Sequence, residues 1–194
     1  MNTSANSNIS QPDKKLSAVC GLFCPACFAY IGTHEDRSLL EERAKKLDIP
    51  VEELECDGCR SDRRTFFCRI MCKMVPCAKE KGVEFCGSCP DYPCEEIRNF
   101  QKAMPNRIEL WQSHQRIKEA GFETWYEEKL KHYACPGCGV MNSATDLLCR
   151  KCGNDPGSKY AELHKEEIMV HLERLRNDNT LAEILKKHKK DHSG

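Results

Sequence analysis

Two cysteine pairs in the last third of the chain have the spacing of a metal site. Cys135 and Cys138 form one Cys-x-x-Cys-Gly turn, and Cys149 and Cys152 form a second, with ten residues between the inner cysteines. Each turn directs two thiolates at one ion, and the glycine that follows permits the positive φ of such turns. Four thiolates make a closed tetrahedral site, which is a structural and not a catalytic geometry. We predict a structural zinc ribbon here, with a single iron as the alternative.

A second cysteine pattern lies near the N-terminus, where Cys20, Cys24 and Cys27 have Cys-x-x-x-Cys-x-x-Cys spacing. Three thiolates on one compact loop leave one position of a cubane iron–sulfur cluster open. Radical enzymes that cleave S-adenosylmethionine use this spacing in a large βα barrel, but this chain has neither the length nor the alternating strands for a barrel. We therefore expect three ligands of a zinc or iron–sulfur site, with the fourth ligand supplied by a later cysteine.

Further cysteines follow as two Cys-x-x-Cys turns, and single cysteines stand on either side of the second turn. We predict that these residues also bind metal: Cys56, Cys59, Cys77, Cys86, Cys89 and Cys94. The two turns could share one zinc ion across the intervening helix. The roles of Cys68 and Cys72 stay open, as does the choice between zinc and an iron–sulfur cluster.

Composition favours metal-bound thiolates over disulfides. The 194 residues include 15 cysteines, which count toward a hydrophobic fraction of only 40%, so metal or disulfide cross-links must supplement a thin core. The odd cysteine count fits poorly with full disulfide pairing. The N-terminal segment is polar and lacks an apolar signal region, and no run approaches the roughly 18 apolar residues of a membrane span. We expect a cytoplasmic protein with no membrane association.

Apolar spacing predicts helices through most of the remaining sequence. Leu40, Ala44 and Leu47 share one helix face, with Thr33 and Asp36 as the capping start. A short helix is expected after Pro50, and further helices near 97–104, 110–121, 122–133, 168–175 and 181–188. No strand pattern longer than the ribbon hairpins stands out. The expected fold class is mainly α: a small metal-stabilised cysteine-rich domain, a short β zinc ribbon and C-terminal helices.

These elements divide the chain into five segments. We expect a disordered tail over residues 1–15, a cysteine-rich metal-binding domain over 16–104 and a helical connector over 105–133. The ribbon spans 134–157, and C-terminal helices occupy 158–194.

Other residue patterns give little support for catalysis or for nucleic-acid binding. The histidines lack HExxH spacing, and no Walker, GxSxG or GxGxxG pattern occurs. We expect His114, His164 and His171 to have packing or surface roles. The net charge is zero, the ribbon hairpin over 140–148 is neither basic nor aromatic, and nearby acids balance the basic run over 186–190. Four arginines form a denser cationic patch, expected to offset thiolate charge: Arg60, Arg63, Arg64 and Arg69.

The ordered cysteine motifs resemble those of the domain of unknown function 3795 family. The resemblance rests on the run from Cys20 to Ile31, on Cys56 to Arg60, and on the run from Cys77 through Phe85 to Cys94. It spans about Cys20 to Phe100. The resemblance implies metal binding by cysteines and no established reaction.

Two functional hypotheses follow from these observations. The first is a non-catalytic, multi-zinc module that acts as a binding or regulatory adaptor, with a protein as its partner. The second is an iron–sulfur redox protein or small enzyme that uses Cys20, Cys24 and Cys27. Nucleic-acid binding through the arginine patch is a weaker third hypothesis. Whether the chain is an enzyme is left open, and the sequence favours the first hypothesis.

Overall fold

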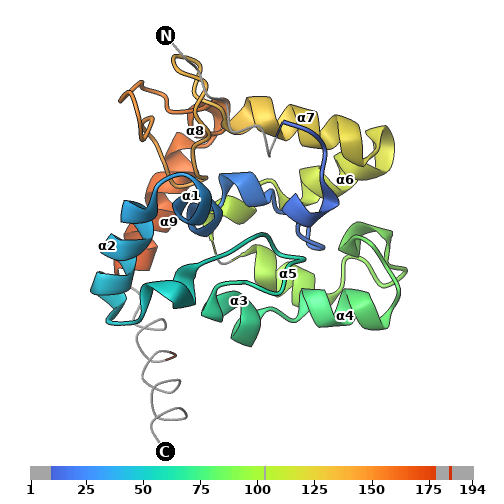
Figure 1. Cartoon of the computed structure of the whole chain (residues 1–194). Coiled ribbons are helices and arrows are strands. Elements are labelled where there is room, and N and C mark those ends of the chain that lie inside the picture. The colour runs from blue at the N-terminus through green and yellow to red at the C-terminus, as the bar shows by residue number, and fades with distance from the viewer. Residues whose placement is uncertain (1–9, 103, 178–183, 185–194) are drawn as a thin grey trace, which may run out of the picture.

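The computed structural model describes residues 10–102, 104–177 and 184, and it is mainly helical (Figure 1). Within these residues, β pairing is limited to two isolated bridges, Ser17 with Phe23 and Ala134 with Met141. The expected helical class is therefore confirmed, whereas the strands expected for the ribbon do not appear: one bridge closes the base of that loop.

The N-terminal part is a series of short helices around cysteine turns. Residues Lys14–Leu16 form the 3-10 helix η1, and Cys24–Ala26 form η2 directly before helix α1, Phe28–His34. Helix α2, Arg37–Leu47, packs on α1 and is followed by η3, Val51–Leu54. The predicted stripe is confirmed because Leu40 and Ala44 are both buried, in a small cluster with Leu54 and Phe66. Asp36 occupies the N-cap of α2, while Thr33 lies in α1.

Three short helices carry or adjoin several of the middle cysteines. They are α3, Phe66–Met71, α4, Met74–Glu80, and α5, Glu95–Gln101, with the 3-10 helix η4, Cys86–Ser88, between α4 and α5. Met74, Ala78 and Ile97 are buried in a second cluster, against which several partly buried cysteines pack. Cysteine side chains therefore make up part of the second cluster, beside its aliphatic residues.

Two longer helices cover the cysteine-rich part. The 3-10 helix η5, Pro105–Arg107, leads into α6, Leu110–Ala120, and α7, Phe122–Tyr133, follows directly. Gly121 separates α6 from α7 with φ 84°, a left-handed conformation that glycine adopts without strain. The loop over 134–157 then leads to α8, Lys159–Leu163, and α9, Lys165–Asn177. Figure 1 shows α6 and α7 on one side of the molecule, with α1 and α2 on the other.

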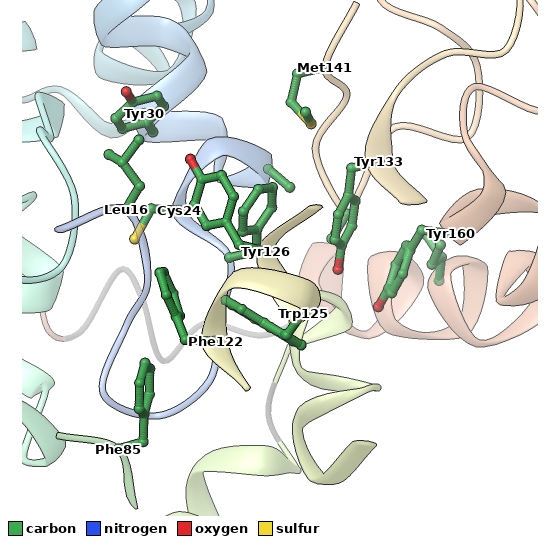
Figure 2. Packing of buried hydrophobic residues seen from close by; sticks show 14 residues of the cluster. Leu16, Cys24, Tyr30, Phe85, Phe122, Trp125, Tyr126, Tyr133, Met141 and Tyr160 are labelled. Carbon is green, nitrogen blue, oxygen red and sulfur yellow. The ribbon is translucent and has the colours of Figure 1, made fainter. Parts of the chain in front are cut away.

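The main core is aromatic and joins segments that are far apart in sequence. Phe23 packs edge-on against Tyr126, with ring centroids 5.1 Å apart, and against Trp125 at 5.8 Å. Tyr133 stacks on Tyr160 of α8 at 4.8 Å, and Figure 2 shows these two rings side by side. The N-terminal cysteine loop, α7 and α8 therefore share one core.

Part of the C-terminal prediction lies outside the described residues. Ile168 is fully buried and Leu172 partly buried, as the predicted stripe of α9 requires. The helix expected over 181–188, apart from Ile184, and the basic run over 186–190 are not among the described residues. No described helix combines the length and the apolar character needed to cross a membrane.

Candidate metal centres

The C-terminal cysteines form a compact four-sulfur arrangement. The Sγ atoms of Cys135 and Cys152 lie 3.6 Å apart, as do those of Cys138 and Cys149. All four sulfurs lie within 4.8 Å of one another. Zinc–sulfur bonds of about 2.3 Å in a tetrahedron place the sulfurs about 3.8 Å apart. These residues therefore have the spacing of a site for one metal ion, and we call them the four-cysteine group.

Backbone hydrogen bonds shape both turns of the four-cysteine group in the same way. The N–H of Gly139 donates to the carbonyl of Cys135 at 2.8 Å, and the N–H of Gly153 donates to that of Cys149 at 2.9 Å. Both glycines have positive φ, 73° and 72°, which explains why a glycine follows each cysteine pair. The N–H of Gly137 donates to Cys135 Sγ at 3.3 Å.

Asn142 and Arg150 attach the four-cysteine group to the rest of the molecule. The fully buried amide of Asn142 donates to the carbonyl of Gly157 at 2.7 Å and accepts from the N–H of Arg150 at 3.0 Å. The Arg150 guanidinium donates to the carbonyl of Met141 and forms an ion pair with Glu35, beyond the end of α1. The loop is therefore held both internally and against the N-terminal helices.

Without metal, Cys149 and Cys152 of this group have pKa values shifted in opposite directions. Burial opposes ionisation of Cys149, but the N–H groups of Cys152 and Lys151 and the neighbouring thiols lower the pKa of Cys149 to about 6. The backbone of Asn154 lowers the pKa of Cys152, but the hydrogen bonds of its thiol with Cys138 and Cys149 raise that pKa to about 12. One thiolate is thus stabilised near neutral pH, and a bound cation would displace the remaining protons.

Five cysteines of the N-terminal half form what we call the first thiol group: Cys24, Cys27, Cys56, Cys59 and Cys68. The N–H of Cys59 donates to Cys24 Sγ at 3.4 Å, which joins two turns that are 35 residues apart. Burial and the neighbouring thiols of Cys56, Cys59 and Cys68 raise the pKa of Cys27 to about 12. Cys68, whose role the sequence left open, therefore lies among the predicted ligands.

The other six cysteines form the second thiol group: Cys20, Cys72, Cys77, Cys86, Cys89 and Cys94. The N–H of Cys86 donates to the carbonyl of Val19 at 2.7 Å, so the Cys86 turn adjoins the Cys20 loop. Burial and the thiols of Cys94, Cys77, Cys89 and Cys72 raise the pKa of Cys86 to about 12. Cys20 interacts with Cys59 as well as with Cys72 and Cys86, and so links the two groups.

The N-terminal thiols are more widely spaced than those of the four-cysteine group. Among the described residues, the four-cysteine group alone has three or more ligand atoms that all lie within 4.8 Å of one another. The structure therefore brings the predicted N-terminal ligands into two neighbourhoods without closing a site for one ion around any three of them. Cys59 of the first turn and Cys86 of the second turn both interact with Cys20 and Cys72, and a zinc ion shared by the two turns stays a prediction.

The raised pKa values also bear on reactivity. Burial is the first cause for Cys20, Cys27, Cys56 and Cys86, and nearby thiols add to it in each case. Thiols with such values stay protonated at neutral pH, whereas a nucleophilic cysteine requires a thiolate. The charge of a bound cation would stabilise the thiolate form of these four residues.

His114 lies beside the second thiol group. It is 4% exposed, and among the described residues neither ring nitrogen has a hydrogen-bond partner. Burial lowers the pKa of His114 to about 4, with the nearby Cys20 backbone offsetting part of the shift, so the ring is neutral at physiological pH. The expected burial on the face of α6 is confirmed, but satisfied packing is not, because both nitrogens lack partners.

The arginine patch is occupied by partners other than thiols. Arg63 forms two hydrogen bonds with Asp57, at 2.8 and 2.6 Å, and Arg69 pairs with Glu53. Arg60 donates to the carbonyls of Ser17 and Glu84 and lies over the Phe85 ring. These arginines therefore pair with carboxylates and backbone carbonyls, whereas the sequence suggested thiolates or phosphates as their partners.

The structure also reveals a polar cluster that the sequence did not suggest. The Glu109 carboxylate accepts from His132 at 2.9 Å, from His164 at 2.7 Å and from Lys129 at 2.5 Å. These residues lie at the start of α6, in α7 and at the end of α8. Only the Lys129–His132 spacing on one helix face would have given a local signal, and that spacing is common on solvated helices.

Comparison with known proteins agrees with the sequence motifs. Residues 16–99 match the model of a family described as "Protein of unknown function (DUF3795)", which confirms the resemblance over the cysteine-rich segment. The match ends before α6, so His114, the Glu109 cluster and the four-cysteine group all lie beyond it. No curated protein and no solved structure matches the chain.

Proposed function

We propose, from the family match and the geometry of the four-cysteine group, that this chain is a non-catalytic binding or regulatory module stabilised by metal. The four-cysteine group binds one structural zinc ion as a zinc ribbon, and the N-terminal thiols bind further metal. The observation that carries this proposal is the mutual approach of four sulfurs within 4.8 Å on two glycine-terminated turns. Four sulfur ligands leave no open position for substrate, which fits a structural role.

A protein partner in the cytoplasm fits this module better than nucleic acid. Large apolar side chains on α8 and α9 are more than half exposed, including Leu163, Met169 and Val170. Such side chains contribute to protein contacts, whereas phosphate binding requires free cations, and Arg63 and Arg69 are already paired with acids. All fifteen cysteines are free thiols, the state that the reducing cytoplasm maintains.

A second candidate function is that of an iron–sulfur protein, and the wide spacing of the N-terminal thiols favours it. In a polynuclear cluster each thiolate binds a different iron, so the sulfur ligands stand farther apart than around one zinc ion. The first and second thiol groups have neighbouring sulfurs without a set of three inside 4.8 Å. Redox chemistry would then reside in the N-terminal half, with the four-cysteine group as structural support.

Anaerobic purification followed by metal and acid-labile sulfide analysis tests both candidates. The module proposal predicts two or more zinc ions per chain, without iron or sulfide. One zinc with several irons and sulfides would establish the second candidate instead. The Cys149→Ser variant should lose one zinc and keep all other metal. An unchanged zinc content in that variant would contradict the assignment of zinc to the four-cysteine group.

A further inference from the structure

His114 is a buried imidazole with no evident use in the metal-free chain. It is 4% exposed on α6, and neither Nδ1 nor Nε2 has a hydrogen-bond partner among the described residues. Buried polar atoms are normally paired, so two unpaired nitrogens on one ring point to a missing partner. Tyr92 contacts the ring edge-on at 5.0 Å, but that contact satisfies neither nitrogen.

Two cysteine turns leave space for this ring. Gly21 and Gly87 directly follow Cys20 and Cys86, and the imidazole lies against both glycines. A Cβ at Gly87 would lie 2.8 Å from His114 Nδ1, and a Cβ at Gly21 would lie 3.2 Å from His114 Cε1. Any larger residue would displace the ring. The two turns therefore bring a nitrogen ligand next to two predicted sulfur ligands.

Cys72 is a further candidate ligand, because it packs against the same cluster as Cys20 and Cys86. Cys20 is buried in the second cluster, and Cys72 and Cys86 pack against that cluster from the end of α3 and from η4. The hydrogen bond from the N–H of Cys86 to the carbonyl of Val19 fixes the two turns relative to each other. Three thiolates and one neutral imidazole are an ordinary donor set for zinc. In the absence of metal these donors are not within 4.8 Å of one another, so binding requires rotation of their side chains.

We propose that His114 is the nitrogen ligand of a metal ion bound by Cys20, Cys72 and Cys86. This inference rests on the proposed metal binding of the N-terminal cysteines and adds a ligand from outside the segment that matches the family model. The site therefore spans the cysteine-rich segment and α6. It also gives Cys72 a role as a ligand, which the sequence left open.

Two variants of the full-length protein, His114→Gln and His114→Cys, test the ligand role. His114→Gln should lose one metal ion per chain by elemental analysis. His114→Cys should keep that ion, because a thiolate replaces the imidazole, and metal-edge X-ray absorption should show that the nitrogen contribution is lost. The matched control is His164→Gln, which removes another largely buried histidine, one that pairs with Glu109, and should keep the wild-type metal content.

The outcomes separate this inference from the proposed function. Wild-type metal content in His114→Gln, with an unchanged absorption spectrum, would overturn the ligand role and leave the other metal sites intact. A wild-type chain with one zinc ion and no other metal would overturn N-terminal metal binding altogether, before any variant is compared. If His114→Gln fails to fold, His114→Cys decides: loss of the ion from a folded His114→Cys chain would contradict the proposal.

Discussion

Glu109 is the side chain at which α6, α7 and α8 meet. Its carboxylate is 14% exposed and accepts hydrogen bonds from a lysine and two histidines on neighbouring elements. Burial opposes the charge, but the hydrogen bond from His132 and the charge of Lys129 outweigh it and hold the pKa of Glu109 well below its usual value. The ionised carboxylate is therefore part of the folded structure.

The Glu109→Gln substitution should lower the free energy of unfolding by about 2–3 kcal/mol at pH 7, because it leaves the Lys129 ammonium without its buried counterion. The pKa of Glu109 is lower in the folded state than in the unfolded state, where it is about 4.5. The carboxylate therefore contributes fully to stability above the unfolded-state pKa, and this contribution is lost as pH falls through the folded-state pKa. Urea unfolding of both proteins from pH 7 to pH 3 measures this difference, which should shrink toward acid.

Glu128→Gln is the control for Glu109→Gln. Glu128 pairs with Arg116 on a half-exposed surface, where an ion pair contributes at most about 1 kcal/mol. Loss of metal in acid affects wild type and variants alike, so it cancels in the comparison. Equal losses of stability in the two variants would show that the Glu109 cluster has no special importance.

At the scale of elements, Asn142 joins the two arms of the loop that carries the four-cysteine group. Asn142→Ala would leave the carbonyl of Gly157 and the N–H of Arg150 without their partner. We expect a loss of about 2–3 kcal/mol in stability and about 10–100-fold weaker zinc binding at the four-cysteine group. Thermal unfolding and zinc competition with a chelator measure the two effects.

Asn99→Ala is the matched substitution on the exposed face of α5. We expect it to change stability by less than about 0.5 kcal/mol and to leave zinc affinity unchanged. If Asn142→Ala bound zinc as tightly as Asn99→Ala, the two cysteine turns would hold their geometry without the amide bridge.

Local spacing predicted some elements well and others not at all. Helices α2, α6 and α7 have eleven or twelve residues, so each shows a full period of apolar spacing. That spacing predicted the buried face of Leu40 and Ala44 and the helix end at Gly121. Helices α1, α3, α4 and α8 have five to seven residues, too few to show periodicity.

The same contrast holds for the site residues. The four-cysteine group was predictable because its ligands come from two local turns with fixed spacing. The neighbours of Cys68 and Cys72, the unpaired ring of His114 and the Glu109 cluster all depend on contacts between elements far apart in sequence. Residue spacing along the chain does not predict contacts between distant elements, so only the folded structure could reveal them.

At the scale of the whole molecule, the segment that matches the family model shares its aromatic core with α7. Phe23 from that segment packs against Trp125, Tyr126 and Tyr133, and Phe85 stacks on Phe122. A fragment ending at residue 102 would expose these aromatic faces. We expect that fragment to lack a dispersed proton NMR spectrum and slow amide hydrogen exchange, even with metal present.

A chain that lacks residues 178–194 is the control for this truncation, because it keeps every contact described above. It should retain the dispersed spectrum and the slow exchange of the full chain. A well-folded 10–102 fragment would show instead that metal alone supplies the cohesion of the cysteine-rich half, and that the shared aromatic core contributes little to it.

The two tryptophans stand in different parts of this core. Trp125 is 1% exposed among the aromatic rings, while Trp111 packs on the second cluster beside Tyr92, next to the cysteine turns. The protein therefore carries two built-in fluorophores, one for each half of its interior. Replacing either indole with phenylalanine would leave a single tryptophan, so that metal loading near Cys86 and unfolding of the aromatic core could be followed separately by tryptophan emission.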